Sequence, residues 1–564
     1  MSVIGIDLGT TNSLVCHFNG ERSELIPNAL GQVITPSVVS YDENQKELLF
    51  GQIAKDRLIS HPKQTAACFK RAMGSNYQYK LGKKVFSAIE LSALLLKQLK
   101  ADAEAFLGHS VTEAIISVPA YFSDSQRNAT KQAGQLAGLK VSRLINEPTA
   151  AALAYGVLDK SDEQMFMVVD MGGGTLDISI LDIFENVVEV RASAGDNYLG
   201  GEDFSLAIRD KFIADTGIKL KKLSSPELGK LAKHIDKLKH QLSSQHEAEF
   251  SIDLLGKSFQ WSLSRTEFQA QIAPLIKRFV GPIERAMRDS GISSEQLDNV
   301  FLVGGATRMP WIRSEVTRLF RLMPMSHIDP DQVVALGTGV QVALKNRDQA
   351  IDDIVLTDVC PYTLGVDIAV ETGRNQHEGG HFLPIIERNM TVPISREERL
   401  HTLKDNQTQV VCTVYQGESR LTKNNVELGE IAVPVPKAKA GEQFVDVRFT
   451  YDINGILEVI VKVGENGHTE KAIINSGNSR LTDEEISDSM AKLAALKIHP
   501  RENEENRQIV AKLERLYEEF LGDHRHFLAA VLKNFEQAMN TQDLAVIDQV
   551  KKETIAVIKE YESN

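Results

Sequence analysis

Two segments, far apart in the chain, combine the residue types that bind phosphate. One covers residues 3–13, VIGIDLGTTNS, and the other covers residues 168–177, VVDMGGGTLD. Each consists of an apolar run, an Asp, a glycine turn with a Thr, and then further strand-forming residues. Because glycine lacks a Cβ, the main-chain N–H groups of such a turn can approach an anion closely. One copy alone would be an ordinary glycine hairpin, whereas the pair predicts a phosphate clamp built from two matching turns.

The two acidic residues of these segments are Asp7 and Asp170. Together they could hold a hydrated Mg²⁺ between the β- and γ-phosphates of a nucleotide, because this small cation keeps much of its water. The residues after each turn again favour a strand, so each turn is predicted to lie in a β-hairpin. This excludes a Walker A loop, which requires a Gly-Lys-Ser/Thr ending followed by a helix.

The composition limits the classes of function. With 564 residues, the chain should form three to four units at a prior of ~150 residues per domain. No apolar run approaches the ~20 residues that a membrane span needs. The net charge of −13, with no Lys/Arg cluster, argues against binding to nucleic acid. No export signal precedes Val3, so we expect a cytoplasmic protein.

The four cysteines, Cys16, Cys68, Cys360 and Cys412, show no CxxC spacing and each lies among mainly apolar residues. We expect buried thiols, with neither a zinc site nor disulfides.

Lys70 and Glu147 are the charged residues of interest in the first part of the chain. A Lys between an aromatic residue and a glycine turn is usually solvated, but here a phosphate site is expected nearby. Glu147 stands directly before a proline, at the end of a predicted strand. The order of strands and helices begins again at Phe166, which predicts two halves of the same plan facing each other across a cleft.

Three further segments contain glycine turns or a polar helix face that could complete a nucleotide site. The first is a glycine turn that ends in an acidic helix start. The second is one face of a basic helix over 227–243, which taken alone would be solvated. The third is a glycine turn after a buried strand, where an Arg could stack on adenine. The residues are Gly200, Gly201 and Glu202; Asp236, Lys239 and Ser243; and Gly304, Gly305 and Arg308.

The C-terminal part changes character. Residues 352–359 form a short apolar segment fenced by acids, which favours either a buried strand or an exposed linker that docks. Strict alternation over 445–463, with a tight turn at 452–455, predicts an antiparallel β-sandwich of roughly 120 residues. From Thr482, which forms a capping box with Glu485, amphipathic helices run to the C-terminus.

At this point a dense set of motifs resembles the DnaK-type seventy-kilodalton heat-shock chaperones. The motifs are IDLGTTNS, FKRAMG, VPAYFSDSQR, NEPTAAALAYG, DMGGGTLDIS, GDNYLGGEDF, LVGGATRMP and DPDQVVALG. They cover residues 3 to about 343, and DVCPYTLGV, YDINGILEV and ALKIHPRE continue the resemblance. It implies an actin-like (ribonuclease H-like) α/β ATPase domain in two lobes over 1–349 and an interdomain linker over 350–359. An antiparallel β-sandwich that binds peptides would follow over 360–480, and an α-helical lid over 481–564. A helical bundle that only packs on the sandwich is the alternative to the lid.

The resemblance also implies roles for single residues. Lys70 and Thr175 would contact the γ-phosphate or the attacking water, with Asp177 in the same catalytic set. Asp7, Glu147 and Asp170 would hold Mg²⁺ through water. ATP or ADP is the implied cofactor, with K⁺ as a further suggested ion. The implied nucleotide contacts are Gly9, Thr10, Thr11, Asn12, Gly172, Gly173, Gly174, Thr175, Gly200, Gly201, Glu202, Asp236, Lys239, Ser243, Gly304, Gly305, Arg308 and Asp331.

The adenine pocket departs from the family pattern at two positions. Asp236 stands where the family has Glu, and Ala306 where it has Ser. We expect ATP to bind less tightly than in general-purpose relatives, since each lost hydrogen bond is worth ~1 kcal/mol.

The predicted peptide cleft departs from the pattern as well. By resemblance Val366, Leu400, Val410 and Cys412 line its central pocket, and Ala369 and Leu403 arch over the peptide. The best-known pattern has the large arch residue first and the small one second, and here the order is reversed. Because close-packed pockets discriminate by single methylene groups, we expect a narrow range of extended, apolar client peptides.

Partner surfaces follow from the same resemblance. Pro119 and Arg143 match the surface that receives a J-domain co-chaperone, although a solvated Arg is an equal alternative. Residues 244–262 look shorter than the family loop gripped by a nucleotide exchange factor, so such a factor is expected to be dispensable. In the linker, Thr357 replaces a family Leu, which predicts weaker coupling between ATP and peptide.

Three functions fit an actin-like fold: an ATP-driven peptide-binding chaperone, a small-molecule kinase and a filament-forming protein. The C-terminal part separates them. A kinase needs an acceptor pocket inside its cleft and has no use for a sandwich and helical tail, and a filament former needs no acid-fenced linker. The chaperone is therefore the favoured function.

Overall fold

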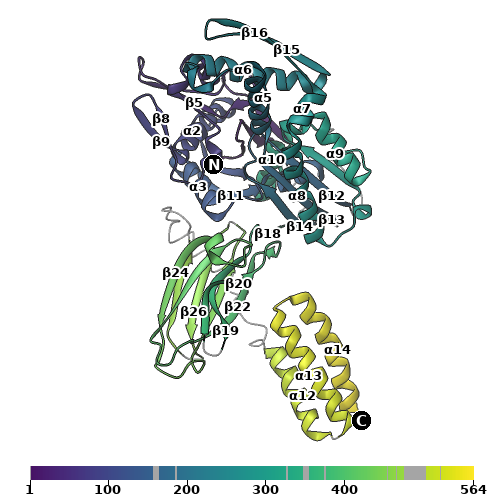
Figure 1. Ribbon diagram of the computed structural model, residues 1–564. Helices are drawn as coiled ribbons and strands as arrows, with labels where there is room; N and C mark the ends of the chain where they lie inside the picture. The colour runs from purple at the N-terminus through teal and green to yellow at the C-terminus, as the bar shows by residue number, and fades with distance from the viewer. Residues whose placement is uncertain are drawn as a thin grey trace. The chain divides into compact units, whose positions relative to one another are not determined.

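The computed structural model describes residues 2–156, 164–184, 187–325, 328–346, 355–373, 376–453, 455–464, 467–474, 504–520 and 522–563. Its contacts divide the chain into two compact units. The first contains residues 1–362 together with Arg388–Val392, and most of the remainder forms the second. The first unit therefore extends beyond the predicted end of the linker at residue 359. Figure 1 shows the elements in both units.

Two sheets of the first unit repeat one strand order. The first half of this unit, residues 2–156, has the order β11-β10-β1-β2-β3, and the second half, residues 164–346, supplies β17-β12-β13-β14. In each half a hairpin of antiparallel strands is followed across the sheet by a parallel strand. This arrangement confirms the predicted repeat of the plan. The strands are β1 (Ser2–Leu8), β2 (Asn12–Phe18), β3 (Ser23–Ile26), β10 (Val111–Val118), β11 (Lys140–Asn146), β12 (Gln164–Met171), β13 (Leu176–Phe184), β14 (Val187–Asp196) and β17 (Asn299–Val303).

Two further strands extend the second sheet beyond β14. β18 (Val355–Val359) pairs in parallel with β14, and β21 (Thr391–Val392) pairs antiparallel with β18. The acid-fenced apolar segment is therefore a strand over its described part, whereas Asp352, Asp353 and Ile354 lie outside the described residues.

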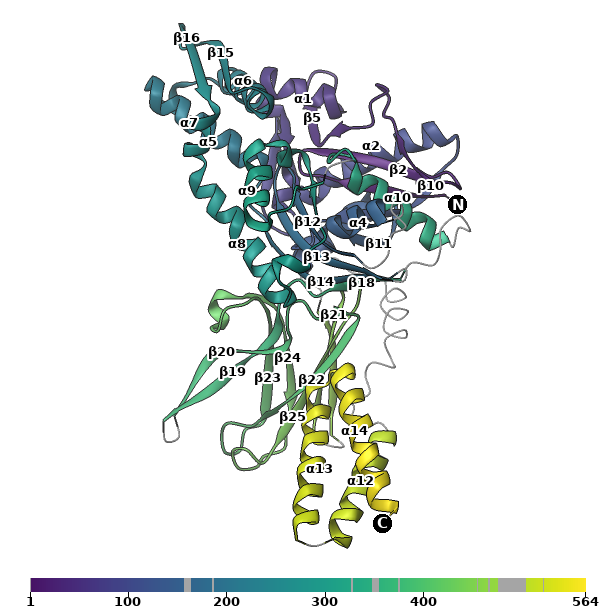
Figure 2. The same cartoon turned by 90° about the vertical axis from the view of Figure 1, so that its right-hand side faces the viewer.

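Helices α4 (Glu147–Gly156) and α10 (Val333–Asn346) pack on each other between the two sheets, as Figure 2 shows. Their approach is close. A Cβ on Gly337 would lie 1.7 Å from the Ala150 carbonyl oxygen, so no residue with a side chain fits there. The shared core of alanines and branched residues holds the two halves in register.

The outer faces of the sheets are covered by separate groups of helices. In the first half these are α2 (Ala88–Leu107) and α3 (Asp124–Leu136). In the second half they include α5 (Gly201–Thr216), α6 (Ser225–Ser244), α7 (Arg265–Gln271), α8 (Ala273–Ser290) and α9 (Pro310–Phe320). Serine caps begin several of them: the Ser87 hydroxyl accepts the N–H of Glu90 while the Glu90 carboxylate accepts the Ser87 N–H.

Each half of the first unit also contains smaller elements. They are β4 (Thr35–Pro36), β5 (Val38–Asp42), β6 (Glu47–Phe50), α1 (Gly51–Ser60), β7 (Thr65–Ala67), β8 (Gln78–Leu81), β9 (Lys84–Ser87), β15 (Glu247–Leu254) and β16 (Lys257–Ser264). Two short 3₁₀ turns, η2 (Phe69–Ala72) and η5 (Gly305–Arg308), also contribute to the candidate site.

The second unit contains two antiparallel four-stranded sheets, with the orders β20-β19-β23-β24 and β22-β25-β26-β27. The apolar residues at alternate positions of β25 and β26 are buried, as the pattern over 445–463 predicts, and Thr450 and Glu458 between them are buried as well. The strands are β19 (Leu364–Gly373), β20 (Gln376–Ile386), β22 (Ile394–His401), β23 (Gln409–Gln416), β24 (Val426–Pro434), β25 (Phe444–Tyr451), β26 (Leu457–Val463) and β27 (Thr469–Ile474). Asn454 of the predicted turn lies outside the described residues.

The C-terminal helices have a core of their own. α12 (Glu504–Glu519), α13 (Asp523–Thr541) and α14 (Leu544–Ser563) pack through Leu513, Leu516, Leu528 and Phe535, all fully buried. Thr482 and Glu485 of the predicted capping box lie outside the described residues.

Candidate functional site

The two glycine turns predicted to bind phosphate meet directly. The first lies between β1 and β2, where Asp7 pairs with Leu14, and the second between β12 and β13, where Asp170 pairs with Asp177. A Cβ on Gly173 would lie 1.7 Å from the Thr11 hydroxyl oxygen. A side chain at position 173 would have to displace Thr11, so glycine permits this close contact, and the folded chain brings the two turns together as the sequence predicts.

Four carboxyl groups gather beside these turns with one buried lysine. Lys70 Nζ donates a hydrogen bond of 2.7 Å to Glu147 Oε1. The Ser117 hydroxyl donates to Asp7 at 2.7 Å, and the Tyr121 N–H donates to Asp177 Oδ1 at 2.9 Å. The second carboxylate oxygen of Asp177 is buried and has no hydrogen-bond partner within the described part of the chain.

Burial and mutual repulsion make these carboxyl groups weak acids. Burial, followed by the charge of Glu147, raises the pKa of Asp7 to about 7, although Lys70 and Ser117 act in the opposite direction. The same two causes raise the pKa of Asp177 to about 7 and the pKa of Asp170 well above its ordinary value. The pocket thus holds more acidic groups than Lys70 can neutralise, which favours a bound cation.

Backbone geometry explains how Lys70 reaches this cluster. It lies in η2, which starts directly after Cys68, a residue in the left-handed region with φ 56°. Such a conformation is uncommon for a residue with a side chain. Cys16, Cys360 and Cys412 are buried, as predicted. Cys68 is half-buried as a residue, but burial raises the pKa of its thiol to about 12, so this thiol is shielded from water as well.

The third predicted glycine segment joins the second turn through the main chain. The N–H groups of Gly201 and Glu202 donate to the carbonyl oxygens of Gly172 and Gly173 at 3.0 and 2.9 Å. Gly200 approaches Gly174 so closely that a Cβ there would lie 2.5 Å from the Gly174 nitrogen. The start of α5 is therefore hydrogen-bonded to the phosphate turn and packed against it.

The residues predicted for the adenine pocket form two small groups. On α6, Lys239 pairs with Asp236 at 2.9 Å and donates to the Gly201 carbonyl oxygen at 3.2 Å, while Ser243 contacts the sulfur of Met309 at 3.8 Å. Near η5, Arg308 pairs with Asp331 at 2.9 Å and with Asp329 at 2.6 Å.

Glycines connect both groups to the phosphate turns. A Cβ on Gly201 would lie 3.7 Å from the Ala306 Cβ, and one on Gly304 would lie 2.9 Å from Asp170 Oδ1. Gly305 faces Asp331, where a Cβ would lie 2.8 Å from Oδ1. The predicted adenine residues thus adjoin the carboxylate cluster.

The residues predicted for the co-chaperone surface lie on neighbouring strands. Pro119 follows the last residue of β10, and Arg143 lies on β11 opposite Ile115. Arg143 also lines a cavity of about 280 Å³ together with Ser142, Gln341 and Lys345. Burial lowers the pKa of Arg143, and the neighbouring Asp358 of β18 raises it.

The residues predicted for the peptide cleft lie in the second unit. Val366 on β19 and Cys412 on β23 are fully buried, and Val410 and Ala369 are half-buried. Leu400 on β22 is half-buried, whereas Leu403 is 40% exposed. Val410 and Cys412 share one face of β23 because successive side chains of a strand alternate.

A comparison with models of known families identifies the chain. The model described as Hsp70 protein matches residues 3–83 and 78–564. The chain belongs to the Hsp70 family. It is accordingly an ATP-dependent chaperone with ATPase activity, and its mixed α/β architecture of several domains agrees with this family. Client peptides and J-domain co-chaperones are the partners that Hsp70 membership implies.

The carboxylate cluster and glycine turns fit the Hsp70 ligands, ATP and Mg²⁺. No three His, Cys, Asp or Glu side chains among the described residues stand close enough together to ligate a metal directly. However, the excess of buried acids suits a cation that keeps its own water shell. The Thr11 hydroxyl is buried without a partner in the described chain, at the contact between the two turns, where it could bind phosphate.

Sequence reasoning missed several residues that support this Hsp70 site. The Ser117 hydroxyl donates to Asp7, and the Tyr121 N–H donates to Asp177. No local pattern marks Ser117, and Tyr121 lies inside the quoted motif VPAYFSDSQR without a predicted role. Arg71 and Asp203 pair at 2.6 Å, and both lie inside quoted motifs, next to Lys70 and Glu202. Arg71 and Asp203 could have been found from the sequence, because each is adjacent to a predicted site residue.

Among the helices of the described residues, none combines the length and the apolar character that crossing a membrane would require.

Proposed function

We propose that this Hsp70 protein is a specialised bacterial chaperone of the HscC type. In this function, ATP hydrolysis in the first unit drives cycles of binding and release of extended apolar peptides. The peptides would bind in the β-sandwich over 360–480, with the linker over 350–359 and a helical lid over 481–564. A cytoplasmic location and a role in the stress response stay predictions.

The observation that carries the ATPase assignment is the joining of two glycine turns beside a buried Lys–Glu pair. Mg²⁺, when bound, would offset the phosphate charge, with Asp7, Glu147 and Asp170 holding its water ligands. Lys70 and Thr175 would orient the γ-phosphate and the attacking water. Asp177, with one carboxylate oxygen free of partners in the described structure, could accept a hydrogen bond from that water. Positioning and charge stabilisation supply most of the catalysis in such a transfer.

Adenine is proposed to bind between α6 and η5. The ion pairs of Lys239 with Asp236 and of Arg308 with Asp331 would hold the two sides of this pocket. Since Asp236 is shorter than Glu and Ala306 lacks a hydroxyl, we expect the affinity for ATP to be modest.

The proposed client range is narrow because both arch positions and the pocket differ from the general pattern. Leu403 would contribute most of the arch from one side of the groove, opposite the small Ala369. Leu400 and Cys412 would shape a pocket that prefers apolar, non-aromatic side chains.

J-domain co-chaperones are proposed to act at Arg143, which lines a cavity with Gln341 and Lys345 of α10. The two strands β15 and β16 are joined by a turn at Leu255 and Gly256, both in the left-handed region. Because this hairpin is short, we propose that ADP release needs no exchange factor. An ADP release rate that rises strongly with such a factor would contradict this part of the proposal.

The function can be tested with a fluorescent apolar peptide on the full chain. Addition of ATP with Mg²⁺ should accelerate peptide release, and ADP should not. Lys70→Ala should retain peptide release on ATP binding but fail to return to the slow-release state, because that return requires hydrolysis. A peptide release rate that is identical with ATP, with ADP and without nucleotide would contradict a chaperone cycle.

A further inference from the structure

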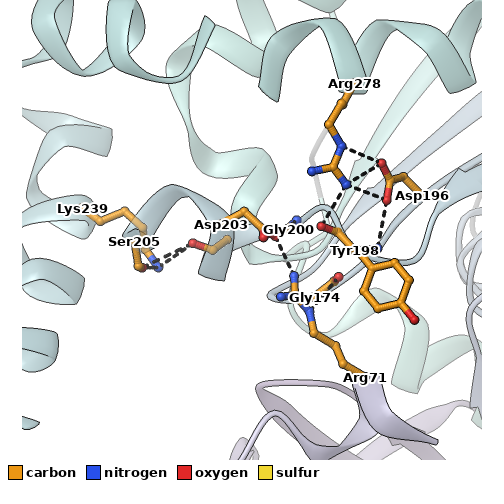
Figure 3. A network of polar contacts seen from close by, with 10 residues as sticks. Arg71, Gly174, Asp196, Tyr198, Gly200, Asp203, Ser205, Lys239 and Arg278 are labelled. Atoms are coloured by element: carbon orange, nitrogen blue, oxygen red, sulfur yellow. Dashed lines mark hydrogen bonds and ion pairs between the residues drawn. The ribbon is translucent and has the colours of Figure 1, made fainter. Parts of the chain in front are cut away.

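Two adjacent side chains of η2 point to different halves of the first unit. Lys70 pairs with Glu147 of the first half, whereas Arg71 reaches the second half. The Arg71 Nε donates to the Gly174 carbonyl oxygen at 3.0 Å, and its Nη2 donates to Asp203 Oδ2 at 2.6 Å. Figure 3 shows Arg71 directed at both acceptors. One short turn thus connects the buried lysine to the second phosphate turn.

The carbonyl group that Arg71 holds belongs to the same peptide unit as the Thr175 N–H. A peptide unit is planar and trans, so its carbonyl and N–H groups point in opposite directions. When Arg71 fixes the carbonyl, it therefore also fixes the direction of the Thr175 N–H and the starting position of the Thr175 side chain.

Three successive carbonyl groups of this turn accept hydrogen bonds. Those of Gly172 and Gly173 accept from the main chain at the start of α5, and that of Gly174 accepts from Arg71. Two of the three restraints therefore come from the second half itself. The third comes from the first half, one residue away from Lys70.

Asp203 holds Arg71 in this position. Its Oδ2 also accepts the Gly200 N–H at 2.8 Å, so the carboxylate is anchored to the turn that packs against Gly174. The Arg71 and Asp203 side chains are 20% and 17% exposed, which limits screening of the pair by water. A lysine lacks the rigid planar fork that directs Nε and Nη2 at these two acceptors, because its ammonium is a compact charge on a flexible chain.

We propose that Arg71 is a positioning residue for ATP hydrolysis, which sets Thr175 in register with Lys70 by clamping the Gly174 carbonyl. This inference rests on the proposed function. Arg71 acts through the peptide unit and not on the nucleotide. Its loss should therefore slow the chemical step and leave the affinity for nucleotide almost unchanged.

The test compares single-turnover ATP hydrolysis and nucleotide affinity in four variants of the full chain. Arg71→Ala should slow hydrolysis by about ten- to a hundredfold, as expected for misplacement of a reacting group by a fraction of an ångström to one ångström. Arg71→Lys should slow hydrolysis less than Arg71→Ala does. Asp203→Asn leaves the hydrogen bond from Arg71 to the Gly174 carbonyl oxygen in place, so this variant should also slow hydrolysis less than Arg71→Ala does. The double variant of Arg71→Ala with Asp203→Asn should hydrolyse ATP no more slowly than Arg71→Ala alone.

Arg278→Ala is the matched control. Arg278 makes a two-pronged pair with Asp196 in the same network, and both residues belong to the second half. Its loss removes a comparable ion pair without touching the Gly174 carbonyl, so hydrolysis should stay within about twofold of the unmodified rate, as for an exposed pair.

Two results would overturn the inference. One is hydrolysis by Arg71→Ala, or by a folded Arg71→Lys if the alanine variant does not fold, at the unmodified rate. The other is a loss of nucleotide affinity as large as the loss of rate, which would make Arg71 a binding residue. Lys70→Ala distinguishes this failure from failure of the proposed function. If Lys70→Ala is inactive while Arg71→Ala is active, only the role of Arg71 is wrong.

Discussion

Lys70 and Glu147 form an ion pair of 2.7 Å in which the two side chains are only 4% and 9% exposed. The pair joins η2 to the first turn of α4 and lies among Asp7, Asp170 and Asp177. A single buried lysine cannot balance this number of carboxyl groups, so the carboxylates repel one another.

The stability of the nucleotide-free protein should fall as the pH rises. Burial and the charge of Glu147 raise the pKa of Asp7 and of Asp177 to about 7 in the folded chain, from the ordinary value of 3.8. Between pH 4 and 7 the folded chain therefore holds protons that the unfolded chain has released, and its free energy of unfolding decreases through that window. Above pH 7 this contribution should level off.

Asp177→Asn tests this pH dependence. At pH 8 the variant should be more stable than the unmodified protein by on the order of a few kcal/mol. At pH 5 this gain in stability should be smaller. Urea unfolding at several pH values measures the effect, and Mg²⁺ with ADP should reduce the difference. Asp253→Asn, at an exposed position of β15, is the control. Parallel stability curves for Asp177→Asn and the unmodified protein would contradict the prediction.

Thr357→Leu should strengthen the coupling between ATP and peptide. Thr357 pairs with Glu189 on β14, and its hydroxyl is buried without a hydrogen-bond partner in the described residues. An unsatisfied buried hydroxyl costs about 1–3 kcal/mol, which opposes docking of β18. Peptide-stimulated hydrolysis should therefore increase in Thr357→Leu and in Thr357→Val, which keeps the size of the side chain. Thr357→Ser retains the hydroxyl, so peptide-stimulated hydrolysis should not increase in this variant. Equal stimulation in all four proteins would show that docking of this strand does not limit coupling.

Arg143→Asp should abolish stimulation by a cognate J-domain protein while basal hydrolysis is retained. Arg143 lines a cavity and interacts with Asp358, so charge reversal removes a cation from a partly covered surface. Lys140→Asp, at an exposed position on the same strand, applies the same charge change and serves as the control. Stimulation that persists in Arg143→Asp would remove this residue from the partner surface.

The double variant Ala369→Met with Leu403→Ala should change the rank order of affinities across a panel of heptapeptides. The swap moves the large side chain to the other side of the proposed groove, where it would favour different peptide side chains by about 1–3 kcal/mol. Val411→Ala is the control, since Val411 is 47% exposed on the opposite face of β23 from Val410 and Cys412. An unchanged rank order would show that these positions do not set selectivity.

The sequence predicts the paired hairpins, the repeated strand order and the sandwich strands because their signals are local. Glycine turns after apolar runs, serine caps and alternation each act within a few residues. The pairing of β18 with β14 joins residues far apart in the chain and could be either a strand or a linker on the pattern alone.

The candidate site shows the same limit. Lys70, Glu147 and the turn residues could be named from their motifs. The Ser117 contact to Asp7 and the left-handed backbone at Cys68 could not, because both arise from packing between distant segments. The division into two compact units at residue 362 also depends on such contacts.

The most direct test of the central claim is single-turnover hydrolysis of ATP by Lys70→Ala and Thr175→Ala. Both variants should fold, as judged by urea unfolding, and should hydrolyse ATP at least about a hundredfold more slowly, because these groups act where charge develops. Lys97→Ala, at an exposed position of α2, should hydrolyse at the unmodified rate. Hydrolysis near the unmodified rate by either Lys70→Ala or Thr175→Ala would contradict the assignment of this site as the place of ATP hydrolysis.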